Sequence, residues 1–363
     1  MLSSKKNGSV DLREISILIT AAGSPSMPGL VKCLRANGER KIRIIGVDMN
    51  IDKTIEDFVD KCLLVSPATD ISYVDNLLEI CKAEKVDILF PGISDELISL
   101  SKRMKDFEAI GTIVSVSNQY SLEMCVNKLR LYEFLSNHNI QTPKFYPVHT
   151  LEEFEKGVQT IGYPFVLKKA VSTGSRGIRI VDPAHSRADI LFNEKPSSFF
   201  ISYEELHSTL EEVRELPEML LMEYLPGKEY SVDVLAEKGN VRLICGRYNT
   251  VVNSSIPMES ILAKDDVAYD YCGKVVQLLD FDGNVNFDFK YSNDGRPILM
   301  EINPRIGAGT VADNAGGVNM SYFRIKQLLG EDIPANIEIK YGTRMKRRYL
   351  EQFSFEPSFG AFG

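Results

Sequence analysis

The sequence lacks the patterns that mark disulfide frameworks, histidine catalysis and membrane spans. Its six cysteines are widely scattered without a Cys-x-x-Cys pair, so we expect reduced thiols rather than a disulfide frame or a zinc knuckle. The four histidines stand alone, outside any His-Glu-x-x-His or similar cluster. No apolar run approaches the roughly 18 residues of a membrane span. These absences favour a cytoplasmic protein with no membrane segment.

The sequence also lacks a block of basic residues. The net charge is −8 and the isoelectric point about 5.3, and no basic run is long enough to follow a phosphodiester backbone, so we expect no nucleic-acid partner. The 363 residues, 44% of them hydrophobic and 25% charged, suffice for roughly two or three globular domains with a large core. We expect residues 1–14 to be a disordered tail without a cleavage site, and residues 351–363 to be a second tail.

Residues 15–120 alternate short apolar runs with helical stretches. Strands separated by single helices are typical of βαβ units, so we expect a Rossmann-like domain with a parallel sheet. The segment TAAGSPSMPG follows the first strand, where such folds bind ligands at helix N-termini. It lacks Gly-x-Gly-x-x-Gly, which an oxidoreductase built on this domain would need. A helix-opening turn without ligand explains the segment equally well.

The middle of the chain opens with an amphipathic helix. Its apolar residues Leu122, Cys125, Leu129 and Tyr132 recur at helical spacing, and Ser121 is the expected N-cap. The strands FVLKKA and GIRIVD then flank the loop VSTGSRG, and we expect a mobile helix within the polar segment 185–215. Antiparallel strands return in MLLMEYL and KEYSVDVLAEKGNVRLICGRY, before a last helix, MSYFRIKQLLGE, and a strand, TRMKRRYLEQF.

Residues 286–305, NFDFKYSNDGRPILMEINPR, predict a hairpin with facing polar residues. A two-residue turn at Asp294-Gly295 sets Asp288 opposite Glu301 and Asn286 opposite Asn303. Strand alternation then puts these four side chains on one face, and the other face carries Phe287, Phe289, Met300 and Ile302. Facing like charges are destabilising unless a cation lies between them. We therefore favour a magnesium site over a solvated strand face.

Two stretches could bind phosphates. The glycines of STGSRG (172–177) allow close backbone approach, and the backbone amides could form an anion nest. On this stretch alone a plain β-hairpin is the better explanation. Lys168 lies on the strand that enters the loop, where its ammonium could reach the same phosphates, although a solvated strand lysine explains it more simply. Strand parity puts Lys168 and Lys169 on opposite faces, so only one of them can serve.

Four further residues could bind a nucleotide or a substrate. Glu223 and Glu229 flank a Pro-Gly bend that could present backbone groups to an adenine edge and a carboxylate to ribose; surface glutamates are the alternative. Arg305 precedes a glycine-rich loop, where it could bind a transferring phosphoryl group or a carboxylate. Arg247 could bind a substrate carboxylate, and a structural salt bridge explains it at least as well.

In their order and spacing these stretches resemble the ATP-grasp superfamily, most of all its carbamoyl-phosphate-synthase-large-subunit-like branch. The resemblance runs from the N-terminal α/β domain to about residue 340. It implies a mixed α/β and α+β fold, in which the Rossmann-like domain 15–120 precedes a two-subdomain ATP-grasp fold with antiparallel sheets. The smaller subdomain with the phosphate loop would occupy residues 121–222, and the subdomain with the magnesium site residues 223–350.

The resemblance also implies residue roles. Lys128, in VNKLRLYEFLSNHNIQTP, and Lys168 match the two lysines that bind nucleotide phosphates. The implied loop residues are Ser172, Thr173, Gly174, Ser175 and Gly177; Glu223, Tyr224 and Leu225 would lie near adenine, and Glu229 on ribose. Asp288, Glu301 and Asn303 would be the metal ligands. Arg305 would lie near the γ-phosphate, and the resemblance implies that Arg305 and Lys168 are the catalytic residues. Two positions depart from the pattern: Lys169 stands where a proline is frequent, and Asp288 where glutamate or glutamine is usual.

The resemblance implies a ligase that phosphorylates a carboxylate with ATP and lets an amine attack the acyl phosphate. We expect ATP and Mg²⁺ as cofactors, with Mn²⁺ as an alternative metal. The expected partners are small carboxylate and amine substrates, and a homodimer is among the expected assemblies. Two alternatives stay open: phosphorylation of a small acid with ammonia as acceptor, and nucleotide binding without catalysis. The combination of Asp288, Glu301, Asn303 and Arg305 favours catalysis. The chain is too short for the two such units of a complete carbamoyl-phosphate synthase.

Overall fold

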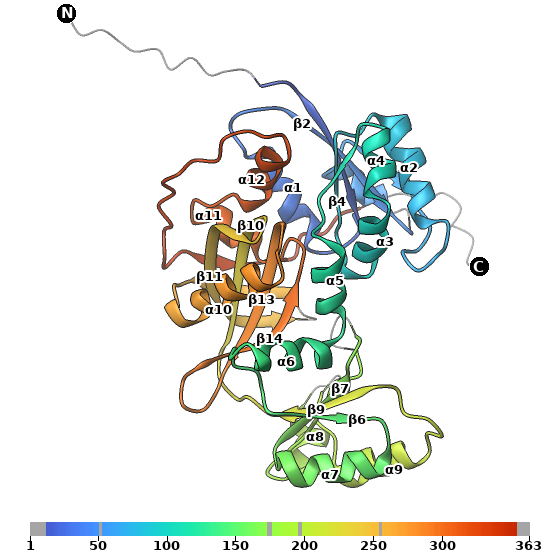
Figure 1. Ribbon diagram of the computed structural model, residues 1–363, viewed down its shortest axis with the longest axis vertical. Coiled ribbons are helices and arrows are strands. Elements are labelled where there is room, and N and C mark those ends of the chain that lie inside the picture. The colour runs from blue at the N-terminus through green and yellow to red at the C-terminus, as the bar shows by residue number, and fades with distance from the viewer. Residues whose placement is uncertain (1–11, 51–52, 173–175, 195–197, 254–255, 354–363) are drawn as a thin grey trace, which may run out of the picture.

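The computed structural model describes residues 12–50, 53–172, 176–194, 198–253 and 256–353. The described residues form three sheets (Figure 1). The N-terminal sheet has the strand order β3-β2-β1-β4-β5, and every neighbouring pair in it is parallel. This confirms the predicted parallel-sheet domain. Its elements are β1 (Ile15–Thr20), α1 (Met27–Arg35), β2 (Ile42–Asp48), η1 (Lys53–Asp57), β3 (Lys61–Leu64), α2 (Tyr73–Glu84), β4 (Ile88–Phe90), η2 (Ser94–Glu96), α3 (Leu97–Lys102), α4 (Met104–Ala109) and β5 (Ile113–Val114).

Both faces of the N-terminal sheet are covered, as the continuous apolar runs of its strands require. Ile17 and Ile19 of β1 pack into one core with α1, and Leu18 packs into the opposite core with α2, α3 and α4. The first core also receives Tyr322 and Ile325 from the far end of the chain. The C-terminal helix thus covers one face of the N-terminal domain, and Figure 1 shows it beside α1.

The second sheet is antiparallel and has the order β14-β13-β10-β11-β12-β15. Helix α10 packs its apolar stripe on one face of this sheet, where Cys272 and Val275 meet Val232 and Phe287 in the largest core. Of the strand predicted for TRMKRRYLEQF, only the three residues Arg344–Lys346 form a strand, and the rest of the prediction is wrong for the described residues. The elements are β10 (Glu229–Glu237), β11 (Asn240–Asn253), β12 (Ile256–Leu262), α10 (Asp266–Leu278), β13 (Gly283–Tyr291), β14 (Pro297–Asn303), α11 (Thr310–Ala315), α12 (Met320–Leu328) and β15 (Arg344–Lys346).

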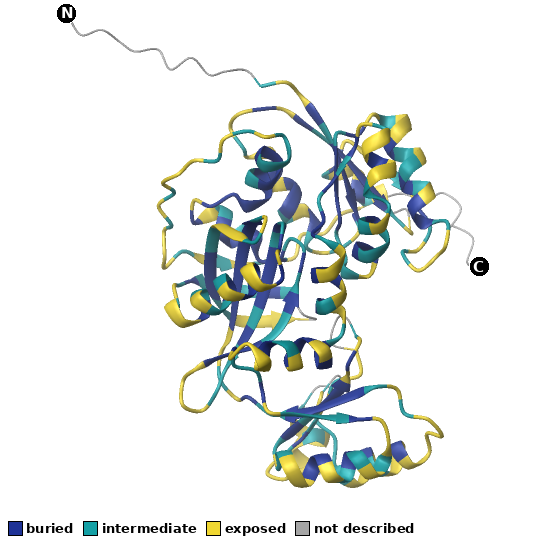
Figure 2. Cartoon of the chain, viewed as in Figure 1, coloured by how far each residue is buried: buried dark blue, intermediate teal, exposed yellow. Residues whose placement is uncertain are grey.

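The third sheet belongs to a separate lobe at the bottom of Figure 1. Its order is β6-β9-β7-β8, with the helices on one side. Phe154 of α7 and Leu206 of α9 pack on Phe165 and Leu221 of the sheet, and Figure 2 shows this core as a thin buried layer. The elements are β6 (Phe145–Val148), α7 (Leu151–Ile161), β7 (Phe165–Lys169), β8 (Arg179–Val181), α8 (Arg187–Asn193), α9 (Tyr203–Glu211) and β9 (Met219–Glu223).

The helix predicted to begin at Ser121 is wrong in detail, because two helices occupy this stretch. Helix α5 (Gln119–Val126) is capped by Asn118, whose side chain accepts from the Ser121 N–H. Helix α6 (Lys128–Asn137) is capped by Asn127, whose side chain accepts from the N–H groups of the next turn. Asparagine caps compete with a continuous helix by bonding locally. The break makes Lys128 the first residue of α6.

The described residues contain no helix that is long and apolar enough to cross a membrane. All six cysteines lie in the interior. Burial raises the pKa of the Cys33 and Cys81 thiols to about 12, so these side chains stay protonated and inert near neutral pH.

Candidate active site

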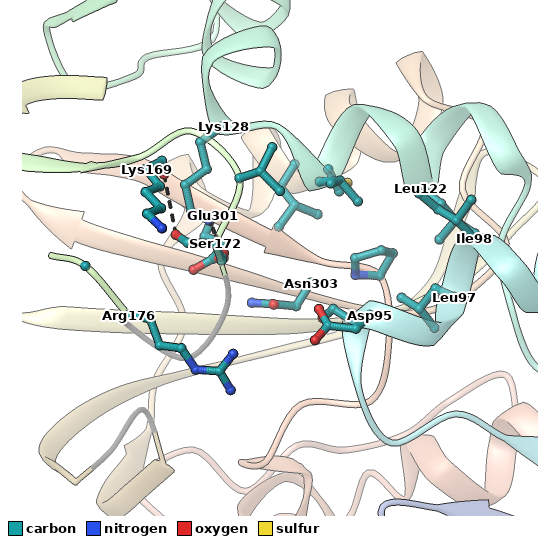
Figure 3. A pocket seen from close by; sticks show the side chains of 17 residues that line it. Asp95, Leu97, Ile98, Leu122, Lys128, Lys169, Ser172, Arg176, Glu301 and Asn303 are labelled. Carbon is teal, nitrogen blue, oxygen red and sulfur yellow. Dashed lines mark hydrogen bonds and ion pairs between the residues drawn. The ribbon is translucent and has the colours of Figure 1, made fainter. Parts of the chain in front are cut away.

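A cavity of about 420 Å³ opens where the N-terminal domain, helix α5, strand β14 and the loop after β7 meet. Figure 3 shows its lining side chains. One end carries charged and polar groups, and the other end is apolar. The lining comprises Ser94, Asp95, Leu97, Ile98, Leu122, Cys125, Val126, Lys128, Lys169, Val171, Ser172, Arg176, Gly177, Glu301, Ile302, Asn303 and Pro304. Among the predicted site residues, Lys128, Ser172, Gly177, Glu301 and Asn303 therefore lie together.

The predicted pairing in the β13–β14 hairpin is confirmed. Asp288 lies opposite Glu301, and Asn286 lies opposite Asn303. The predicted two-residue turn is wrong, however, because Ser292 pairs with Arg296 across three intervening residues, with Gly295 at φ 79°. A three-residue loop with glycine in the left-handed conformation is a common alternative.

A β-bulge at Met300 compensates for the longer turn. Near the turn Phe289 pairs with Leu299, and one step further along Asp288 pairs with Glu301, so Met300 has no partner in the ladder. The prediction that Met300 shares a face with Phe287, Phe289 and Ile302 is wrong, since Met300 packs against the Leu129 and Tyr132 cluster instead. Its carbonyl accepts a hydrogen bond from the Tyr132 hydroxyl at 2.8 Å.

The Asp288 carboxylate is held by neutral groups. Ser231 Oγ donates to Oδ1 at 2.6 Å, and Asn303 Nδ2 donates to Oδ2 at 3.1 Å. Burial, together with the charge of Glu301, raises the pKa of Asp288 to about 6. The described residues include no group of three or more His, Cys, Asp or Glu side chains suited to a metal. The candidate site instead combines two carboxylates with the amide oxygen of Asn303, an oxygen set that suits a hard cation.

Two lysines lie beside this pair of carboxylates. Lys128 Nζ donates to the Ser172 carbonyl at 2.8 Å and lies 3.2 Å from Glu301 Oε1. Its backbone N–H donates to the Ala170 carbonyl, which ties α6 to the end of β7. Lys168 is buried, with Nζ 3.3 Å from the Tyr132 hydroxyl. Burial, and then the charge of Lys128, lower the pKa of Lys168 to about 8.

Lys168 and Lys169 differ in their surroundings, as strand parity predicts. Lys168 is 6% exposed and does not line the cavity, whereas Lys169 is exposed and lines it. The expected phosphate loop is only partly described, because Thr173, Gly174 and Ser175 lie outside the described residues. Arg176 lines the cavity beside this loop and was not predicted.

The segment between Glu223 and Glu229 joins the small lobe to the six-stranded sheet. Glu223 ends β9, and its carboxylate accepts from the Lys144 backbone N–H at 2.8 Å. Tyr224 stacks against Lys290, whose Nζ lies 5.5 Å from the ring centroid, while Leu225 is buried. Glu229 begins β10 and is exposed. These four residues form the link between the lobes and lie outside the cavity lining.

Arg305 bridges the two halves of the molecule. Its Nε donates to Ser94 Oγ at 3.3 Å and its Nη1 to the Ile306 carbonyl at 2.9 Å. Burial lowers the pKa of Arg305, and the charges of Asp288 and Glu301 oppose this shift. The guanidinium is therefore close enough to the carboxylate pair to feel its field.

Arg247 forms a structural ion pair, which was the alternative to its binding a substrate carboxylate. Its Nη1 lies 2.7 Å from Asp233 Oδ2 and 3.3 Å from Asp313 Oδ1, and the residue is 1% exposed. Gly309 covers the guanidinium so closely that a Cβ there would lie 2.1 Å from its central carbon. The glycine-rich loop after Arg305 therefore seals the ion pair from solvent.

Comparison with known families agrees with this geometry. A family model described as "ATP-grasp in the biosynthetic pathway with Ter operon" matches residues 215–351, and one described as "PylC-like, N-terminal domain" matches residues 17–115. Residues 215–351 are thus similar to an ATP-grasp family, and residues 17–115 to a different N-terminal domain family. The carbamoyl phosphate synthase large chain of Clostridium perfringens is 24% identical over 328 residues, which are 86% of this chain and 28% of that protein. The chain thus spans about a quarter of the length of the carbamoyl phosphate synthase large chains that it matches.

Solved structures show the same ATP-grasp architecture. The ADP complex of N5-carboxyaminoimidazole synthetase from Staphylococcus aureus superposes with a TM-score of 0.65 at 16% identity, over 91% of this chain and 81% of that one. The biotin carboxylase domain of 2-oxoglutarate carboxylase from Hydrogenobacter thermophilus, a complex with MgADP and bicarbonate, also gives 0.65, at 17% identity over 91% and 73%. An L-amino acid ligase from Bacillus licheniformis gives 0.59, at 17% identity over 88% and 74%.

The ATP-grasp fold brings residues into the cavity that no local pattern singled out. Ser94, Asp95, Leu97 and Ile98 come from the N-terminal domain, far in sequence from the hairpin. The only available signal was their position just after β4, because ligands of open α/β sheets bind beyond the carboxyl ends of the strands. Arg176 had a weaker signal, as the one cation within the expected phosphate loop.

Proposed function

We propose that the protein is an ATP-dependent carboxylate–amine ligase that forms an amide through an acyl phosphate and releases ADP and phosphate. The observation that carries this proposal is that Lys128, Glu301 and Asn303 line one cavity, with Asp288 directly behind them, opposite Glu301 in the hairpin and hydrogen-bonded to Asn303. Facing carboxylates are unfavourable on their own, and an oxygen-bound cation would remove that cost. The match of residues 215–351 to an ATP-grasp family model and the nucleotide complexes of similar folds support the same function.

The residues around this end would bind the nucleotide. Asp288, Glu301 and the Asn303 amide oxygen would hold Mg²⁺, which when bound neutralises phosphate charge. Lys128 and Lys168 would donate to the phosphates together with Ser172 and Gly177. Glu223, Tyr224 and Leu225 would border adenine, and Glu229 would accept from ribose, because the link between lobes presents both backbone and carboxylate groups.

The proposed reaction has two steps. A carboxylate oxygen of the acid attacks the γ-phosphorus of ATP, the bond to the bridging oxygen of ADP breaks, and ADP leaves. The amine nitrogen then attacks the carbonyl carbon, the bond from that carbon to the phosphate oxygen breaks, and the nitrogen loses a proton to solvent. Arg305 would stabilise negative charge on the transferring group and on the oxyanion that follows.

The decisive experiment follows the oxygen atoms. The full-length protein is incubated with ATP, Mg²⁺ and each of the 20 common amino acids or small acids such as acetate and succinate, singly and in pairs, and ADP release is recorded. Hydroxylamine replaces the amine in a parallel series, because it traps an acyl phosphate as a hydroxamate. For an active acid labelled with ¹⁸O in its carboxylate, one labelled oxygen should appear in the released phosphate.

The outcomes separate the candidate functions. Pair-dependent ADP release with labelled phosphate supports a ligase, and ammonia as the sole effective acceptor supports the carbamoyl-phosphate-like alternative. Mg-ATP binding without acid-dependent ADP release would overturn the ligase proposal.

A further inference from the structure

The end of the cavity furthest from the lysines has no part in nucleotide binding as proposed above. It is built by the N-terminal domain and by α5, and Figure 3 shows Leu97, Ile98 and Leu122 gathered there, while Lys128, Lys169 and Glu301 lie at the opposite end. A single negative side chain, Asp95, stands between the two ends.

Asp95 is an unpaired charge on a firmly held loop. Within the described part of the chain its carboxylate makes no hydrogen bond or ion pair, and the residue is exposed. Its neighbour Glu96 is fully buried and accepts from Thr20 Oγ1 at 2.6 Å and from the N–H groups of Gly92 and Ile93 at 2.9 and 3.0 Å. The loop is therefore fastened to the end of β1, at the point where the strand order of the sheet reverses.

The apolar wall includes side chains that water would otherwise cover. Leu97 and Leu122 are buried, but Val126 of α5 is 38% exposed, and all three line the cavity. Exposed apolar surface in a concave site is typical of a ligand-binding surface. A ligand for this end therefore needs an apolar part as well as a positive charge opposite Asp95.

Building on the proposed ligase function, we propose that the carboxylate substrate is an α-amino acid with an apolar side chain, whose ammonium group faces Asp95. Asp95 and Asn303 line the same cavity, and Figure 3 labels both between the lysines and the apolar end. One carbon separates the ammonium of an α-amino acid from its carboxylate. A carboxylate placed beside Glu301 and Asn303 thus brings its ammonium to Asp95 and directs its side chain to Leu97 and Leu122.

The first test removes the amino group and the aspartate in turn. Specificity constants for ADP release, with hydroxylamine as acceptor, are measured for leucine and for 4-methylpentanoate, which is leucine without its amino group. Asp95→Asn should lower the constant for leucine by roughly ten- to a hundredfold, the range for a lost hydrogen bond between charged groups. The constant for 4-methylpentanoate should not fall. Glu123→Gln is the control, because Glu123 lies on α5 outside the cavity and its carboxylate accepts from Gln119.

The second test changes the apolar wall. Val126→Phe should fill part of the cavity and shift the preference from leucine and phenylalanine toward alanine by at least roughly tenfold, a typical discrimination for a few methylenes. Val267→Phe is the control, because Val267 is similarly exposed, at 50%, but lies on α10 away from the cavity.

The results distinguish this inference from the function on which it rests. Equal use of leucine and 4-methylpentanoate, or an Asp95→Asn variant that loses both equally, would overturn the inference and leave the ligase standing. A protein that binds Mg-ATP but releases no acid-dependent ADP with any acid would overturn both. Amino-acid dependence that vanishes in Asp95→Asn, while melting temperature and stabilisation by Mg-ATP stay unchanged, supports the assignment.

Discussion

Two groups of carboxylates lie close together on the six-stranded sheet, Asp233 of β10 with Asp313 of α11 and Asp288 of β13 with Glu301 of β14, and their charges are balanced in different ways. Asp233 and Asp313 share the buried guanidinium of Arg247. Burial opposes ionisation of Asp233, but the Arg247 charge and the hydrogen bonds to Asp313, Arg247 and Asn286 together lower the pKa of that carboxyl. Burial raises the pKa of Asp313 well above its usual value. The single negative charge, on Asp233, is thus neutralised by the positive charge of Arg247.

Asp288 and Glu301, one strand away, lack such a partner between them. Asp288 is held by a hydroxyl and an amide, and within the described residues Glu301 forms an ion pair with Lys128 alone, at the cavity edge. The difference indicates which group is structural and which is poised for a ligand. A closed ion pair supports the fold, and an unbalanced pair beside a cavity favours an added cation.

The largest expected effect comes from breaking the buried ion pair of Arg247. Arg247→Met leaves two buried carboxyls without their cation, so we expect the free energy of unfolding to fall by about 3 to 5 kcal/mol, measured by urea denaturation at pH 7. Arg242→Met is the control, since Arg242 lies on the same strand but forms an ion pair that is about half exposed. Equal losses of unfolding free energy in the two variants would show that the buried ion pair contributes no more to stability than the exposed one.

Removing one member of the unbalanced pair should affect chemistry rather than folding. We expect Glu301→Gln to release ADP at least about a hundredfold more slowly and to lose the stabilisation that Mg-ATP gives. In chelator it should melt no lower than the parent, because a repulsion across the strands has gone. Glu259→Gln, on β12 and paired with Lys346, is the control. Normal turnover of Glu301→Gln would mean that the facing carboxylates belong to a solvated strand face and do not bind the metal.

A smaller effect is expected at the lysines next to that pair. Lys168→Met should weaken Mg-ATP binding by about 1.5 to 3 kcal/mol, the range for a hydrogen bond to a charged group, and more than Lys169→Met does. Calorimetric titration measures both affinities. Without nucleotide, Lys168→Met should be no less stable than the parent, because burial already disfavours the charged ammonium, as its lowered pKa of about 8 shows. Equal losses of affinity would reassign the phosphate contact.

The smallest expected effect is a change in stability with pH, caused by protonation of Asp288. The pKa of Asp288 is about 6 in the folded protein, above its ordinary 3.8, so between these values the native state holds a proton that the unfolded chain has released. The stability that this proton gives is present below pH 4 and lost as the pH rises through 6. We expect a loss of about 1 to 2 kcal/mol, allowing for water at the cavity. It should be absent in Asp288→Asn and cancelled by Mg-ATP, as thermal melts in chelator and with nucleotide would show.

The sequence predicts the hairpin better than its turn. Alternation and like-charge pairing locate Asp288 opposite Glu301, but the Asp-Gly pair indicates a two-residue turn where three residues form it. The predicted pairing of Asp288 with Glu301 is correct because the bulge at Met300 restores the register. A bulge within a run of apolar residues has no sequence pattern that would predict it. The break at Asn127 was similarly hidden, since the apolar spacing runs on through it.

Contacts between distant segments set the remaining limits. Alternation cannot name the partners of Arg247, because Asp313 lies 66 residues further along the chain. Nor could the hairpin indicate that Asp95 would line the same cavity, since only the packing of the N-terminal domain against β14 brings them together. Periodicity and turn chemistry act over a few residues, whereas the site is assembled over the whole chain.

The bulge at Met300 also couples parts of the protein that lie far apart in the sequence. Its carbonyl accepts from the Tyr132 hydroxyl, which in turn lies 3.3 Å from Lys168 Nζ, so the extra residue in the strand helps to position a lysine that comes from another lobe. Shortening the turn by one residue would shift the register of β14 and withdraw this support, unless a second change restored it. Turn length, bulge and tyrosine therefore act as one mechanical unit.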